Sequence, residues 1–198
     1  MTDPADHAFS SSVKSAQIRK GSRPFYAGMI MADRIDARLA AFAGQVRSFY
    51  LASASADGQP YVQHRGGPPG FLKVLDEKRL AFADFRGNRQ YISTGNFDEN
   101  PKAFIFLMDY ANRRRLKIWG EAQVIEGDAA LNEALIMPGY TAKVEQAIVF
   151  TVTAWDPNCP QHIPHLLPAE EVAALLAERD ARIAELEAQL ASLSASGT

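Results

Sequence analysis

The chain has 198 residues, of which 47% are hydrophobic and 22% are charged, proportions that are ordinary for a globular protein. This length supports one well-buried core with appendages, but not two typical enzymatic domains. Lys and Arg number 21 against 23 Asp and Glu, so the net charge of −2 gives no indication of a nucleic-acid partner. The single cysteine, Cys159, excludes an intrachain disulfide and favours a reducing compartment.

The sequence shows no targeting or membrane-spanning pattern. Its first 17 residues lack the apolar centre of a signal peptide. No apolar run approaches the ~20 residues that a helix needs to cross a bilayer. We therefore expect a cytoplasmic protein with no membrane partner and no nucleic-acid partner.

Residues 1–31 are expected to form an N-terminal arm, because their polar, Ser-rich beginning contains the breakers Gly21 and Pro24. A helix is predicted over about 32–44, with Asp33 as its N-cap. Apolar side chains recur there at helical spacing, namely Ile35, Leu39 and Phe42.

The pattern then changes to that of short antiparallel strands. Asp57-Gly58 is a strong hairpin signal that joins predicted strands over 48–56 and 60–65. A short helix is expected over 129–137. Many short strands with few long helices favour a mainly β barrel or sandwich over residues 32–167. The further predicted strands, separated by turn residues, cover 71–75, 79–85, 103–109, 115–126 and 145–155.

The segment 168–198 is predicted to be a long amphipathic helix that starts at Pro168. Its apolar residues follow a heptad pattern, with Leu176, Ile183 and Leu190 seven apart and Leu186 and Leu193 offset by three. Arg179 interrupts the apolar seam at a d position. Two interpretations stay open: the helix packs on its own barrel, or it forms a coiled coil of about three heptads with a second copy.

Basic residues gather on or beside the predicted strands. Arginine forks and exposed backbone amides at converging strand ends are suited to a phosphate dianion. The alternative for any one of these residues is a solvated strand face. Gly66, Gly67 and Gly70 would let the backbone approach a flat ligand closely. The basic residues in question are Arg65, Lys73, Arg86, Arg89, Arg113, Arg114, Arg115 and Lys117.

Neither a P-loop sequence nor a GxGxxG motif is present, so neither a P-loop site nor a dinucleotide-binding Rossmann site is indicated. The run FADFRGNRQYISTGNFDENPKAFIFLMDY (82–110), followed by RRRLKIWGEAQVIE (113–126), instead resembles the flavin-binding half of the pyridoxamine 5'-phosphate oxidase family. Its ordered features are a strand ending in a polar turn, a helix leading to Asn100-Pro101, and two strands with Gly120 in the second. The resemblance covers about residues 45–156. It implies an FMN-binding split barrel of six to seven antiparallel strands, acting as a homodimer with FMN at the subunit interface.

The resemblance also implies which residues bind the cofactor. Arg65 and Lys73 would contact the phosphate or the ribityl chain, and Gly66 lies directly beside Arg65. Asp84 and Phe85 would line the flavin through their backbone.

The turn after the strand that ends at Phe85 would hold the phosphate, through Asn88, Arg89 and Gln90. Arg115 falls where the family usually has a glutamine that reaches the flavin. Because the family's FMN lies between subunits, Arg113 and Arg115 would act from the partner.

The chain departs from the vitamin-handling enzymes of the family. The loop 66–70 interrupts their continuous Arg-to-Lys segment, and their C-terminal Trp/Arg motif is replaced by the charged helix. No set of residues for a substrate phosphate follows Gly120. Pyridoxamine 5'-phosphate is therefore not the expected substrate. We expect an FMN-dependent oxidoreductase with another small-molecule substrate or electron donor and no identified catalytic residue; the alternative is a non-catalytic flavin or haem carrier or sensor.

Cys159, His162 and His165 lie close together in the sequence and raise the question of a metal site. Zinc usually takes three or four such ligands, and the chain has no other cysteine. Pro160 and Pro164 favour a stiff connecting loop, and a part in the flavin or substrate pocket is a further alternative. We expect no metal.

Overall fold

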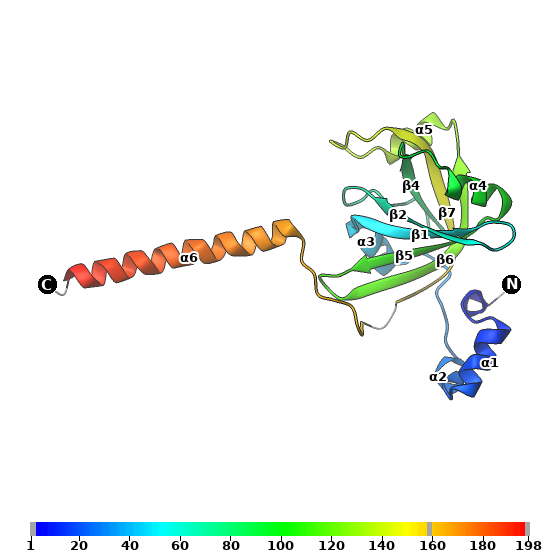
Figure 1. Ribbon diagram of the computed structural model, residues 1–198, viewed down its shortest axis with the longest axis horizontal. Coiled ribbons are helices and arrows are strands. Elements are labelled where there is room, and N and C mark those ends of the chain that lie inside the picture. The colour runs from blue at the N-terminus through cyan, green and yellow to red at the C-terminus, as the bar shows by residue number, and fades with distance from the viewer. Residues whose placement is uncertain (1–2, 158–159, 197–198) are drawn as a thin grey trace. The chain divides into compact units, whose positions relative to one another are not determined.

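The computed structural model describes residues 3–157 and 160–196 and contains one seven-stranded antiparallel sheet. The strand order is β2-β1-β5-β6-β7-β4-β3, so β2 and β3 are its two edges. Figure 1 labels all of these strands except β3. The mainly β, split-barrel prediction is confirmed. The strands are β1 (Ser48–Ala54), β2 (Pro60–Gly66), β3 (Lys73–Val74), β4 (Arg79–Phe85), β5 (Lys102–Asp109), β6 (Arg114–Ile125) and β7 (Val144–Pro157).

The chain forms two compact units. Residues up to 109 and 114–160 make up the first, and residues 110–113 and those from 161 onward make up the second. Within the described residues, no helix combines the length and the apolar character needed to cross a membrane. The helices are η1 (Pro4–His7), α1 (Ser11–Arg19), α2 (Arg23–Tyr26), α3 (Ala37–Gln45), α4 (Ile92–Glu99), α5 (Ala129–Leu135) and α6 (Ala169–Ser196).

Alternate side chains of the strands point into the barrel and form its core, as the two-residue period of a strand requires. Phe49 lies near the centre, with its ring 5.0 Å from that of Phe82 and 5.5 Å from that of Phe71. Such offset and edge-to-face ring pairs stabilise beyond the area that they bury. The inward side chains also include Leu51, Leu80, Ile105, Leu107, Leu116, Ile118, Phe150 and Val152.

Gly120 lies at a register shift between β6 and β7, where the two strands approach closely. A Cβ atom at this position would lie 2.2 Å from the carbonyl oxygen of Thr151 and 2.4 Å from the ring of Phe150. Only glycine fits here without a backbone shift. The residue that the family resemblance singled out therefore has a packing role.

The first barrel helix begins later than predicted, and the prediction that Asp33 caps it is wrong. α3 starts at Ala37, and the carboxylate of Asp36 accepts hydrogen bonds of 2.9 Å from the amides of Arg38 and Leu39. This is ordinary N-cap geometry. Asp33 is not available as a cap because its carboxylate accepts a 2.7 Å hydrogen bond from Lys78.

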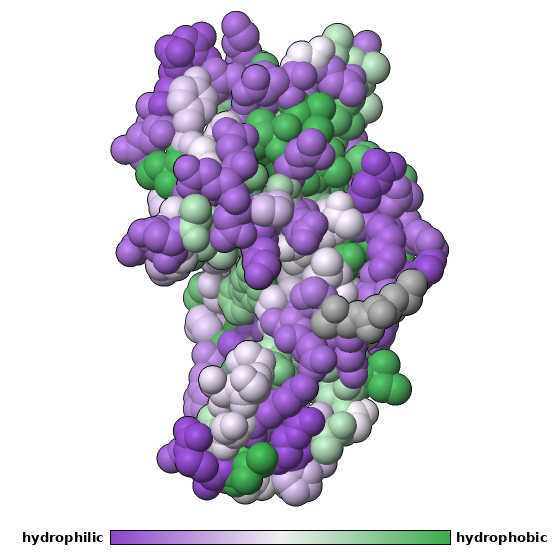
Figure 2. Space-filling model, turned by 90° about the vertical axis from the view of Figure 1, so that its right-hand side faces the viewer, coloured by the Kyte–Doolittle hydropathy of each residue, from purple (hydrophilic) through white to green (hydrophobic). Residues whose placement is uncertain are grey.

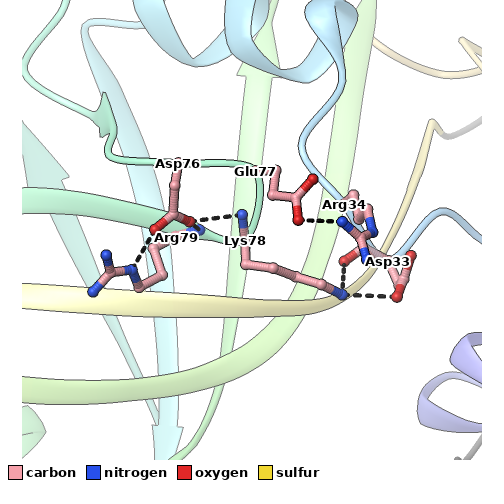
Figure 3. Close-up of polar contacts among 6 residues, drawn as sticks. All are labelled: Asp33, Arg34, Asp76, Glu77, Lys78 and Arg79. Atoms are coloured by element: carbon pink, nitrogen blue, oxygen red, sulfur yellow. Dashed lines mark hydrogen bonds and ion pairs between the residues drawn. The ribbon is translucent and has the colours of Figure 1, made fainter.

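The segment 32–35 is fixed between β7 and the turn that joins β3 to β4 (Figure 3). Lys78 donates hydrogen bonds to the carbonyl oxygen of Asp33 at 2.6 Å and to its carboxylate at 2.7 Å. Arg34 is ion-paired with Glu77, and the indole of Trp155 donates to the carbonyl oxygen of Arg34 at 2.7 Å. These contacts hold the segment before α3 against the barrel.

The N-terminal segment is more ordered than an arm without structure would be. It contains η1, α1 and α2, and Ala5 of η1 is buried in a small cluster with Met31 and Ala154.

Hydrophilic side chains cover most of the face in Figure 2, with an apolar area in its upper part, at the height where Figure 1 places α4. Exposed apolar areas often mark sites for ligands or partners.

We predict that Lys78→Met lowers the free energy of unfolding by about 0.5–1 kcal/mol at neutral pH, because ion pairs this exposed are weak. The hydrogen bond from Lys78 lowers the pKa of the Asp33 carboxyl. Asp33 therefore contributes stability above its unfolded-state pKa of about 4 and loses it as the pH falls through the lower folded-state value. Urea unfolding should show that the difference between the variant and the wild type shrinks below about pH 4. Lys20→Met, at an exposed position, should show no such pH dependence.

Candidate functional site

The two sides of the split barrel meet at a seam between β2 and β4, and an ion pair bridges this seam. Among the described residues no strand ladder joins β2 to β4. Arg65 of β2 donates to the carboxylate of Asp84 on β4, and each side chain is only 13% exposed. The other carboxylate oxygen of Asp84 accepts a 2.9 Å hydrogen bond from Gln146 of β7. Side chains therefore connect the strands where backbone hydrogen bonds do not.

The first turn of α4 is fixed to strands on both sides of the seam. Ser93 donates a 3.0 Å hydrogen bond to Gln63 of β2, and Thr94 accepts one of 3.1 Å from Gln146. One turn later, Asn96 donates a 2.9 Å hydrogen bond to the hydroxyl of Ser53 on β1. These contacts set the position of the N-terminus of α4 relative to the barrel.

A cavity of about 250 Å³ opens at the seam beside this helix N-terminus. Ligand pockets usually measure about 300–1,000 Å³, so this cavity can take a part of a cofactor of the size of FMN rather than all of it. Its lining comes from β2, β4, β7, α4 and the loop 86–91. The lining residues are Tyr61, Gln63, Arg65, Asp84, Phe85, Gly87, Asn88, Arg89, Gln90, Tyr91, Ile92, Ser93, Thr94 and Glu145.

The N-terminus of α4 presents unpaired amides to the cavity. Tyr91 occupies the N-cap position and gives no side-chain cap. The amides of Ile92, Ser93 and Thr94 have no hydrogen-bond acceptor among the described residues. Free N–H groups and the helix dipole together favour an anion at such a helix end.

The loop 86–91 is held in a strained conformation by its own side chains. Arg89 and Tyr91 have φ values of 60° and 52°, which cost of order 1 kcal/mol or more for residues other than glycine. Asn88 accepts a 3.2 Å hydrogen bond from the amide of Gln90. The hydroxyl of Tyr91 accepts from Arg89 Nε at 3.1 Å and donates to Glu145 at 2.8 Å. Strain of this kind is typical of ligand sites.

The same contacts affect the pKa of Arg89. The hydrogen bond with Tyr91, and then the proximity of Glu145, raise the pKa of Arg89 above its ordinary value. The guanidinium therefore stays charged, and the described residues place no carboxylate within ion-pair distance of it.

The model of the family described as pyridoxamine 5'-phosphate oxidase matches residues 35–159, which is more than half of the chain. The chain belongs to this family. No curated protein matches it. HupZ from Group A Streptococcus is similar in structure, with a TM-score of 0.51 at 16% identity over 67% of this chain and 99% of that one. This likeness shows the fold alone.

Two further solved structures are similar over much of the chain. A putative pyridoxamine 5'-phosphate oxidase from Lactobacillus delbrueckii has a TM-score of 0.49 at 17% identity, covering 63% of this chain and 95% of that one. An FMN-binding protein from Syntrophomonas wolfei has a TM-score of 0.49 at 12% identity, covering 78% of this chain and 99% of that one.

Of the nine residues predicted to bind the cofactor, three do not line the cavity. Gly66 follows Arg65 on β2, so it belongs to the opposite face of the strand. Lys73 pairs with Ala81, whose face of β4 packs against α5 rather than the seam. Arg115 pairs with Met108 on the outer side of the sheet. The six that line the cavity are Arg65, Asp84, Phe85, Asn88, Arg89 and Gln90.

The eight basic residues noted in the sequence do not converge on one point. Only Arg65 and Arg89 line the cavity. Arg114 is ion-paired with Asp109 at 2.6 Å, and Lys117 is ion-paired with Asp156 at 2.7 Å. The strand pattern places the side chains of Arg114 and Lys117 on other parts of the sheet.

Some lining residues were not predicted from the sequence. Tyr61 and Gln63 share the face of Arg65 at two-residue spacing, so the strand period could have identified them. Glu145 is brought in by the pairing of distant strands, which no local pattern shows. The alternative that Cys159 belongs to the pocket concerns a residue outside the described part of the chain, and His162 is exposed in the second unit.

We predict that removing one partner of the seam ion pair lowers the unfolding free energy more than removing both partners does. Arg65→Met leaves the largely buried carboxylate of Asp84 without its cation and should cost about 2–4 kcal/mol of unfolding free energy. The double variant Arg65→Met/Asp84→Leu should recover most of this loss, because neither charge is then left alone. Urea unfolding of the two single variants, the double variant and the wild type gives the coupling energy.

The exposed pair Arg114–Asp109 provides the control, and Arg114→Met should cost less than about 1 kcal/mol. If the destabilisation of the double variant equals the sum of the destabilisations of Arg65→Met and Asp84→Leu, the two side chains act independently.

Proposed function

We propose that this protein is an FMN-dependent oxidoreductase that holds the phosphate of FMN at the N-terminus of α4. The observation that carries the proposal is the uncapped first turn of α4, whose free amides line the cavity next to Arg89. Membership of the pyridoxamine 5'-phosphate oxidase family supports flavin as the ligand class.

The charged groups of the cavity fit one additional anion. Asp84 is neutralised by Arg65, and Glu145 accepts the hydrogen bond of Tyr91. The guanidinium of Arg89 is left to pair with a phosphate, with the amides of α4 as further donors. The Nε atom of Arg65 is buried without a hydrogen-bond partner, which is costly unless a ligand supplies an acceptor.

A second copy of the chain would complete the flavin site. The cavity is too small for the whole of FMN, so the isoalloxazine ring would extend beyond it. β5 is apolar on both faces from Ala103 to Met108, a pattern typical of a strand that is covered on both sides. Its outward side chains are only half-buried in the single chain. The outer face of β1, β5 and β6 consists of Tyr50, Ala52, Phe104, Phe106, Met108, Arg115, Lys117 and Trp119.

Arg115 lies on this outer face, with a buried Nε atom that has no hydrogen-bond partner. In a homodimer paired through the outer face, Arg115 would reach the flavin held by the partner subunit. Bound FMN would supply the electron chemistry toward a small-molecule substrate or electron donor. The residues of the chain would bind its phosphate, orient the ring and exclude water.

We predict that the protein binds FMN ~10²- to 10³-fold more tightly than riboflavin, because charge-assisted hydrogen bonds to the phosphate contribute several kcal/mol. Titration of the purified protein with each flavin, followed by fluorescence quenching, measures this ratio. Equal affinities would contradict the phosphate site, and a haem spectrum without flavin binding would favour the alternative ligand.

Anaerobic addition of NADH or NADPH to the FMN complex then tests turnover. Loss of the visible flavin absorbance, with its return on admission of an oxidant, supports an oxidoreductase. A flavin that no nicotinamide donor or artificial reductant can cycle would indicate a non-catalytic carrier or sensor.

We further predict that Arg89→Ala weakens FMN binding by ~10- to 100-fold, since a charged hydrogen bond contributes about 1.5–3 kcal/mol. Riboflavin affinity should hardly change. Arg86→Ala is the matched control, because Arg86 is an exposed arginine of the same loop that does not line the cavity. If Arg86→Ala and Arg89→Ala bind FMN equally well, Arg89 does not contact the phosphate.

A further inference from the structure

The helix α6 is a long, continuous helix whose apolar side chains are exposed. Its 28 residues correspond to a length of about 42 Å. Every side chain described for it, over residues 169–193, is exposed. Apolar residues are 39% exposed at Val172 and 69% at Leu193. A stripe of such residues on one side of a helix usually packs against a partner.

The sequence of α6 repeats with a strict seven-residue period. AERDARI (177–183) and AELEAQL (184–190) share Ala at positions one and five, Glu at position two and an apolar residue at position seven. In heptad terms the a positions are Leu176, Ile183 and Leu190, and the d positions are Val172, Arg179, Leu186 and Leu193. A strict seven-residue period corresponds to about 3.5 residues per turn, slightly fewer than the 3.6 of a straight α-helix. This difference winds two paired helices into a left-handed supercoil.

We propose that α6 pairs with α6 of a second copy of the chain as a parallel, in-register coiled coil. Charge complementarity identifies this occupant. Arg182 occupies a g position and Glu187 the following e position, which face each other across a parallel pair. The two-fold symmetry gives this ion pair twice. An antiparallel pair would place g positions opposite g positions, so Arg182 would lose Glu187 as its partner.

Within one chain, Arg182 is paired with Glu185 at 2.5 Å, where both side chains are more than half exposed. Exposed pairs of this kind contribute little, so Arg182 can exchange Glu185 for Glu187 of the second copy. Such an exchange costs little and adds a contact between chains.

In the proposed parallel pair, Arg179 restricts the register of the two helices. In the parallel pair its two copies share one d layer, next to Asp180 at the e position of the opposing helix. A charged residue in the seam lowers stability but fixes the register, because a shifted pair would place it against leucine. The inference does not depend on flavin binding.

Crosslinking of full-length protein tests the pairing. In a Cys159→Ser background, Leu190→Cys places a thiol at an a position, and Ala188→Cys places one at the outward f position. In a parallel pair the thiols of Leu190→Cys meet at millimolar effective concentration, so disulfide-linked dimer should form about 100-fold faster than for Ala188→Cys. Equal rates for the two variants would overturn the proposal, and so would slow crosslinking of both. An antiparallel pair also gives slow crosslinking, because Leu190 then faces a residue at a d position rather than itself.

A second measurement separates pairing from helix propensity. Arg179→Leu should raise the midpoint of the thermal loss of helical circular dichroism, because it replaces a charged seam layer with an apolar one. Ile183→Asp should lower the midpoint. Ala181→Leu, at an f position, is the matched control and should leave it unchanged. Equal effects of Arg179→Leu and Ala181→Leu would overturn the coiled coil.

Discussion

The ion pair between Arg65 and Asp84 is the constraint on which the site depends. The sheet ends at β2 on one side and carries β4 next to its other edge, so backbone hydrogen bonds cannot close the barrel there. A largely buried charge pair bridges this gap, with Gln146 as an additional donor to Asp84. Gln146 also bonds to Thr94, so the closure of the barrel fixes the first turn of α4. A buried pair is rarely the most stable solution for a core, and its worth here lies in geometry.

The proposed phosphate site lies in a cavity whose side-chain charges cancel. Arg65 and Arg89 face Asp84 and Glu145, so net charge cannot attract an anion to the cavity. In the proposed site the attraction would come instead from amides that the uncapped helix leaves free and from one arginine whose pairing is incomplete. Donors that are fixed before binding lose little freedom when the ligand arrives, which favours tight and selective binding.

The sequence could predict local structure well and long-range contacts poorly. The strand 79–85 is found at its predicted bounds, because its apolar run ends in a polar turn. The helix N-cap was misplaced because Asp33 and Asp36 are equally good caps, and the contact that occupies Asp33 comes from Lys78, 45 residues away. Arg65 and Asp84 were both candidate site residues, yet nothing local shows that they bond to each other. Lys73 and Arg115 were grouped with them through the family resemblance, which does not reveal which face of a strand meets the cavity of the same chain.

Three separate features of the chain bear on the proposed pairing with a second copy. The cavity is smaller than a whole FMN molecule, β5 is apolar on a face that is half-exposed, and α6 carries an exposed heptad stripe. In the proposed homodimer, each contact would be repeated on both subunits. The charged layer at Arg179 makes α6 weak on its own, so its pairing would depend on the local concentration that a barrel dimer provides. The barrel face would then supply the affinity between subunits, and α6 would restrict which ends of the two chains lie together.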